Sequence, residues 1–85
     1  YIEALADAAC KWGLPRHIGY RVVAQAVLGA AKMVLETKEH PGALKDAVCS
    51  PAGTTIVAVQ ALEDRGFRAA VMDCVDRCTE KFNQL

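Results

Sequence analysis

The chain has 85 residues and a mass of 9.1 kDa, which is enough for one small domain. Ten basic and ten acidic residues give zero net charge, which argues against nucleic acid or an anionic membrane as the main partner. With 53% hydrophobic and 24% charged residues, the composition excludes a disordered chain. A domain of this size is expected to remove roughly 60–65% of its unfolded surface from water. The apolar content exceeds what such a domain can hide, so we expect it to pack against something else.

Fifteen alanines and five aromatic residues predict an all-α domain, because alanine favours helices and is a poor strand former. Tyr1 is followed at once by a helical pattern, so we expect the sequence to be part of a longer chain. No apolar run approaches the ~20 residues that span a bilayer, and no signal peptide is evident. We therefore expect no membrane partner.

Glycine and proline divide the chain into helices. Apolar residues at helical spacing predict a first helix over residues 1–12, which ends at Gly13. Pro15 suits the first turn of a second helix that runs to about Thr37 without an interior proline.

The second helix is apolar over most of its circumference. Its polar side chains fall in one stripe: His17, Arg21, Gln25, Lys32 and Glu36. It is either the central helix of a monomer or a helix shared with a second chain. We favour the second interpretation, because three other short helices cannot easily surround it, and residues 29–31 are small enough for another backbone to approach.

Pro41 begins a predicted third helix over residues 41–48, whose residues Leu44, Ala47 and Val48 are expected to face inward. A loop of small residues then leads into a fourth helix that ends near Asp64. Residues 54–59 have a strand-like composition, but there is no second strand to pair with them. After Gly66, a last helix carries one apolar face: Phe67, Val71, Cys74, Val75, Cys78, Phe82 and Leu85.

The cysteines and histidines suggest no metal site. Cys74 and Cys78 are one turn apart on the predicted apolar face, where cysteine behaves as a small buried hydrophobe. The spacing fits neither a zinc site nor a disulfide-rich scaffold, so we expect reduced thiols and a cytoplasmic location. His17 and His40 are expected at the surface, and the sequence contains neither a catalytic triad nor a glycine-rich dinucleotide motif.

The loop Ser50-Pro51-Ala52-Gly53-Thr54-Thr55 allows two interpretations. The N–H groups of a helix start, a close backbone approach at Gly53 and three hydroxyls would form a cradle for a carboxylate or phosphate. The alternative is ordinary capping, with Thr54 as N-cap and Pro51 as a turn former. The physical argument alone favours capping, because every helix needs a start.

The chain resembles the C-terminal domain of the pyrroline-5-carboxylate reductases. The Leu-Gly-Ala-Ala-Lys-Met run at residues 28–33 and the Ser-Pro-x-Gly-Thr-Thr loop at residues 50–55 are the most specific parts of the resemblance. Further segments agree in order and spacing, and together they cover essentially the whole chain: residues 2–8, 13–16, 24–25, 39–41, 44–48 and 66–68.

The resemblance implies an enzyme that reduces pyrroline-5-carboxylate to L-proline with NADPH or NADH. It implies a bundle of about five helices similar to the C-terminal domain of 6-phosphogluconate dehydrogenase, with one long central helix and an interlocked homodimer that can assemble into a higher oligomer of dimers. Residues 1–85 would supply the dimer interface and the substrate-carboxylate loop. By resemblance, substrate-binding residues are Ser50, Gly53, Thr54 and Thr55, and Thr55 is also catalytic.

Two departures from the family stand out. Many members have glycine where Ala52 stands, and its methyl group is expected to narrow the loop. The N-terminal Rossmann domain that carries the nucleotide is absent from this sequence, so cofactor contacts cannot be assigned, and the chain alone is expected to be inactive. The alternative function is a non-enzymatic helical dimerisation module. A helix-turn-helix DNA binder is disfavoured, because neither of the last two helices is basic.

Overall fold

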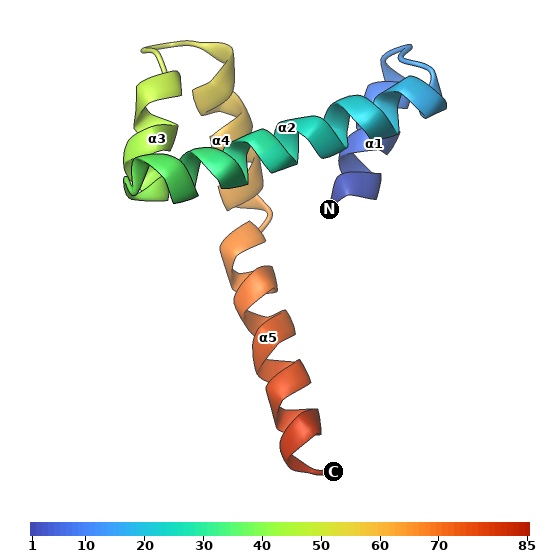
Figure 1. Ribbon diagram of the computed structural model, residues 1–85, viewed down its shortest axis with the longest axis vertical. Helices are drawn as coiled ribbons and strands as arrows, with labels where there is room; N and C mark the ends of the chain where they lie inside the picture. The colour runs from blue at the N-terminus through green and yellow to red at the C-terminus, as the bar shows by residue number, and fades with distance from the viewer. The chain divides into compact units, whose positions relative to one another are not determined.

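The computed structural model describes residues 1–85 and contains five helices and no strand (Figure 1). The helices are α1 (Ile2–Lys11), α2 (Arg16–Thr37), α3 (Pro41–Val48), α4 (Thr54–Asp64) and α5 (Phe67–Asn83). This confirms the predicted all-α class and the five predicted helices. The ambiguous residues 54–59 are helical, because no strand is available to pair with them.

The chain forms two compact units, Tyr1–Leu44 and Lys45–Leu85. The first unit contains α1, α2 and the beginning of α3, and the second contains the end of α3 with α4 and α5. Each unit is described by itself below.

In the first unit, α1 packs against the N-terminal part of α2 (Figure 1). The contact is centred on three buried residues, Ala6, Gly19 and Val23. Gly19 faces α1 at this contact, where a Cβ would lie 3.9 Å from the carbonyl oxygen of Ala6, an ordinary van der Waals distance. An ion pair between Arg16 and Asp7 adds a second connection between the start of α2 and α1.

The predicted helix ends at Gly13 and Gly66 have the left-handed backbone that glycine adopts without strain. Gly13 has φ +105° directly after α1, and Gly66 has φ +70° between α4 and α5. Lys38 also has a left-handed backbone, with φ 59°, and its N–H donates to the carbonyl oxygen of Val34 at 3.0 Å. This bond ends α2 without a glycine.

His40 begins α3, a role that the sequence analysis did not identify. Its Nδ1 accepts a hydrogen bond of 2.9 Å from the N–H of Gly42, the second residue of the helix. This is the geometry of a side-chain N-cap. The predicted surface position is correct, but the ring also satisfies an N–H group that no helical carbonyl can reach.

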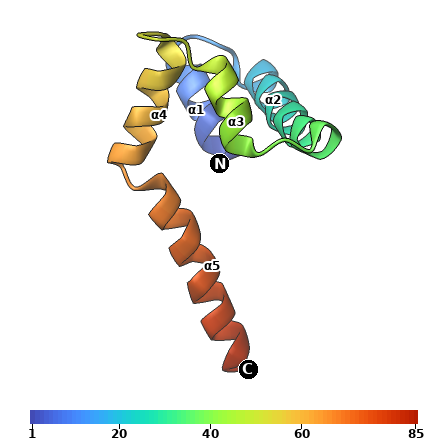
Figure 2. The same ribbon diagram turned by 90° about the vertical axis from the view of Figure 1, so that its left-hand side faces the viewer.

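In the second unit, α5 leaves α4 at Gly66 and continues with no other helix of the unit along its C-terminal half (Figures 1 and 2). The junction carries an ion pair in which Arg68 Nε lies 3.0 Å from Glu63 Oε1. Another pair, Arg77 with Asp73, lies one turn apart on α5. Both pairs are exposed, so they contribute little to stability.

The single chain buries much less surface than predicted. It exposes 7299 Å², whereas an unfolded chain of this mass exposes roughly 13,200 Å², so about 45% is removed rather than the expected 60–65%. Every residue from Lys45 onward is exposed or only half-buried. The predicted inward positions of Ala47 and Val48 are therefore wrong for the isolated chain, as is the predicted burial of Cys74 and Cys78.

The helix α2 is long enough and apolar enough in composition to cross a bilayer, contrary to the expectation from apolar runs. Arg21, Gln25 and Lys32 interrupt the apolar sequence, which is why no continuous run was evident. A core helix of a soluble protein can have the same length and apolar composition as α2.

Candidate functional site

The loop between α3 and α4 contains a tight turn over residues 50–53. The N–H of Gly53 donates to the carbonyl oxygen of Ser50 at 3.0 Å, which closes the turn. Pro51 occupies its second position, and Ala52, the third residue, has φ +60°. Proline followed by a positive φ is the pattern of a type II β-turn.

Ala52 stands where this turn favours glycine. A left-handed backbone brings the Cβ of an L-residue close to the following carbonyl oxygen and costs roughly 1–2 kcal/mol. The cost of Ala52 therefore lies in its backbone conformation, and the expected narrowing of the loop by its methyl group stays a prediction. The Ser-Pro-x-Gly sequence contained this signal, because proline at the second position of a type II turn implies a positive φ at the next residue.

The helix α4 begins without a capping side chain. The prediction that Thr54 is its N-cap is wrong. The N-cap is Gly53, with φ −81° and ψ 177°, and no side chain hydrogen-bonds to the first turn. Thr54 is already the first helical residue. The N–H groups at the start of α4 therefore remain available to an outside acceptor.

The structure brings the four predicted site residues together at one helix start. Ser50, Thr54 and Thr55 are exposed, and Gly53 is half-buried. The Oγ of Ser50 occupies the position that a Cβ on residue 53 would need. Free N–H groups at the positive end of a helix dipole, together with the hydroxyl of a serine in the preceding turn, can bind a carboxylate or a phosphate.

A second feature of the Lys45–Leu85 unit is an open groove of about 240 Å³. It is lined by Lys45, Val59, Leu62, Glu63, Phe67 and Arg68. The hydrogen bond from Lys45 to Asp46, at 2.7 Å, raises the pKa of Lys45. Glu63 neutralises Arg68 across the groove, so the groove presents no uncompensated charge of the kind that selects an anion.

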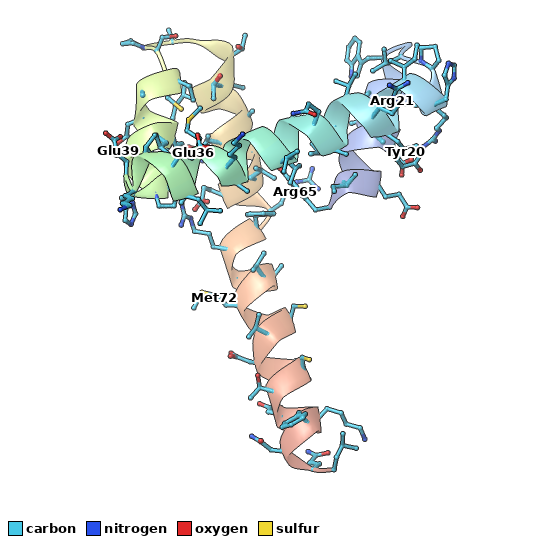
Figure 3. The ribbon with its side chains drawn as sticks, in the orientation of Figure 1. Tyr20, Arg21, Glu36, Glu39, Arg65 and Met72 are labelled. Carbon is cyan, nitrogen blue, oxygen red and sulfur yellow. The ribbon has the colours of Figure 1, made fainter.

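Two helices expose long apolar faces. On α2, the exposed apolar residues include Ile18, Val22, Leu28, Met33 and Leu35. On α5, they include Phe67, Val71, Met72, Val75 and Phe82. Figure 3 shows the side chain of Met72 projecting from α5 with no other part of its unit against it. Such exposure is typical of surfaces that another protein covers.

The remaining candidate groups do not form a second centre. All four cysteines are free thiols, and no three metal-ligating side chains converge. His17 is exposed at the beginning of α2, and His40 is used as the cap of α3. The loop 50–55 is therefore the strongest candidate for ligand chemistry in the chain.

The small size, the five helices and the two exposed apolar helix faces place the chain in the class of domains that associate with another protein chain. Within that class, the whole chain, residues 1–85, matches the family described as pyrroline-5-carboxylate reductase dimerisation. The chain belongs to this family, and the predicted resemblance is confirmed.

Relatives and solved structures agree with the family assignment. The chain is 62% identical over 85 residues to the pyrroline-5-carboxylate reductase of Escherichia coli (strain K12), covering 100% of this chain and 32% of that protein. It superposes with a TM-score of 0.96 on 1-pyrroline-5-carboxylate reductase from Streptococcus pyogenes, at 38% identity over 99% of this chain and 32% of that one. It superposes with a TM-score of 0.90 on Plasmodium falciparum pyrroline carboxylate reductase with NADP bound, at 38% identity over 94% and 30%. The chain thus spans about a third of the length of these proteins.

Proposed function

We propose that this chain is the C-terminal domain of an NAD(P)H-dependent reductase that converts pyrroline-5-carboxylate to L-proline. The single observation that carries the proposal is the family match over the whole chain, supported by 62% identity to a reductase of that name. These relatives are named as enzymes, which favours this function over a non-enzymatic dimerisation module.

The domain would supply a homodimer interface. The exposed apolar faces of α2 and α5 support this role, because their burial against a second copy would remove the surface that the single chain leaves in water. An obligate interface of this kind buries more than ~2,000 Å² in total. The interlocked arrangement of the two copies, and any assembly of dimers, belong to the same proposal.

The loop 50–55 would hold the substrate carboxylate. The hydroxyl of Ser50 and the N–H groups of Thr54 and Thr55 would donate to its oxygens, which is favourable at the positive end of α4. The hydroxyl of Thr55 would hydrogen-bond the ring nitrogen, where charge changes when the imine is reduced. The uncapped first turn and the exposed hydroxyls support these roles.

The nicotinamide cofactor does not fit the residues of this chain. The 85 residues contain no strand and no glycine-rich turn after a strand, the arrangement that holds a dinucleotide. We propose that an N-terminal Rossmann domain of the full-length enzyme binds NADPH or NADH. Without it, the isolated chain would bind no hydride donor and would show no turnover.

The proposed partners are a second copy of the chain and the small-molecule substrate, with no role for nucleic acid or a membrane. The zero net charge supports the first exclusion. The cytoplasmic location expected from the four free cysteines stays a prediction.

The decisive experiment is steady-state kinetics of the full-length enzyme and its Ser50→Ala variant, measured as NADPH oxidation that depends on pyrroline-5-carboxylate. Hydrogen bonds to a charged group contribute ~1.5–3 kcal/mol, so kcat/KM should fall roughly ten- to a hundredfold. Most of the loss should appear in KM, because the carboxylate is present in both ground and transition states. Thr79→Ala, which removes an exposed hydroxyl on α5, is the matched control. An unchanged KM for Ser50→Ala would show that the carboxylate binds elsewhere.

A further inference from the structure

The Ser50 side chain fills the space that a side chain on residue 53 would need, directly before the start of α4. An ideal Cβ on residue 53 would collide with Ser50 Oγ and would lie 3.1 Å from the Ser50 carbonyl oxygen. The φ of Gly53 is −81°, which any residue adopts, so backbone conformation does not require glycine there. The requirement is steric: glycine leaves room for the hydroxyl.

We infer that Gly53 is a positioning residue for Ser50, because the absence of a side chain at residue 53 leaves room for the Ser50 hydroxyl in the turn that leads into α4. This inference rests on the proposed function of the loop. Gly53 directly precedes Thr54, the first residue of α4, so a hydroxyl that fills the side-chain position of Gly53 lies in the turn at the start of the helix. The turn bond from Gly53 N–H to Ser50 O, at 3.0 Å, fixes the two residues relative to each other.

The arrangement holds the Ser50 hydroxyl at one place in the turn before a ligand arrives. Ser50 is exposed and would otherwise sample several rotamers, which lowers the fraction of molecules ready to bind a carboxylate. A side chain at residue 53 would move the Ser50 hydroxyl out of its position or shift the turn. In either case Ser50 would lose its proposed hydrogen bond to the substrate carboxylate, although the serine itself is still present.

A double-mutant cycle in the full-length enzyme tests the inference. Gly53→Ala should raise the KM for pyrroline-5-carboxylate about tenfold or more, and Ser50→Ala should raise it roughly ten- to a hundredfold. Their combination should lie within about threefold of Ser50→Ala alone, because both changes remove the same contact. Gly19→Ala is the matched control. A Cβ there would make only ordinary contacts, 3.9 Å from Ala6 O and from Leu14 Cδ2, so KM should not change.

Thermal unfolding keeps the inference testable if Gly53→Ala folds poorly. Adding Ser50→Ala removes the oxygen with which the new methyl group collides, so the double variant should have a Tm about 2–4 °C above Gly53→Ala. A double variant no more stable than Gly53→Ala would contradict the steric argument.

The outcomes separate the inference from the proposed function. If Ser50→Ala raises KM but Gly53→Ala does not, or if the two effects multiply in full, the positioning role is wrong and the carboxylate site stands. If Ser50→Ala leaves KM unchanged, the carboxylate site and the positioning role are both wrong.

Discussion

The imidazole Nδ1 of His40 accepts a hydrogen bond of 2.9 Å from the backbone N–H of Gly42 and so caps α3. The glycine matters to this contact, because a Cβ on residue 42 would lie 2.9 Å from the same nitrogen. A side chain that folds back over a glycine at a helix start thus occurs twice in this chain, here and where Ser50 lies over Gly53.

The cap predicts a stability effect at His40. Replacement by alanine removes the acceptor and should lower the free energy of unfolding by about 1 kcal/mol. Asparagine, a strong N-cap residue, should restore most of the loss. Chemical denaturation of the two variants measures both values. Equal losses for alanine and asparagine would show that the ring contributes by packing rather than as a cap.

Ala52→Gly should stabilise the turn at the start of α4. The substitution relieves the left-handed strain at φ +60°, but it also gives the unfolded chain more freedom. The net gain should be up to about 1 kcal/mol in the free energy of unfolding. Thermal unfolding measures it, and Ala58→Gly, in the interior of α4, is the control that should lose about 1 kcal/mol. A loss at residue 52 would mean that its methyl group makes contacts that outweigh the strain.

The two threonines of the loop should differ in their effects. Thr55→Val removes the hydroxyl proposed to contact the ring nitrogen and keeps the amide, so kcat should fall while KM changes little. Thr54→Ala should leave stability within about 0.5 kcal/mol, because Gly53, not Thr54, is the cap. Kinetics and thermal unfolding of both variants of the full-length enzyme provide the comparison. A kcat for Thr55→Val equal to that of the unmodified enzyme would remove Thr55 from the chemistry.

Gly29 offers a direct probe of the apolar face of α2. A Cβ there meets nothing within 4 Å in the single chain, so a larger side chain has free space unless another chain fills it. Gly29→Leu should therefore retain helix content and weaken self-association. Circular dichroism and sedimentation of Gly29→Leu, with Gly19→Ala as control, separate the two effects. Unchanged association would mean that no second backbone approaches Gly29.

Much of the fold follows from local sequence signals. Pro15, Pro41, Gly13 and Gly66 placed the helix boundaries within one or two residues, because proline and glycine act on the backbone at their own positions. The four predicted site residues come from the resemblance to a family; they lie at one helix start, and their role in binding stays a prediction.

What could not be predicted depends on contacts between residues or between chains. The choice of Gly53 over Thr54 as N-cap follows from the turn that Pro51 and Ala52 set up, not from the capping preference of threonine. Cys74 and Cys78 were placed on an apolar face, but a periodic pattern does not tell whether the same chain or another covers that face.

The central claim is that the apolar faces of α2 and α5 are covered by a second copy of the chain. The most direct test is the molar mass of purified residues 1–85 by light scattering at micromolar concentration, with circular dichroism to verify the helices. We expect a helical species whose molar mass is twice the 9.1 kDa of one chain. A stable, helical monomer that exposes the 7299 Å² of the single chain would contradict it.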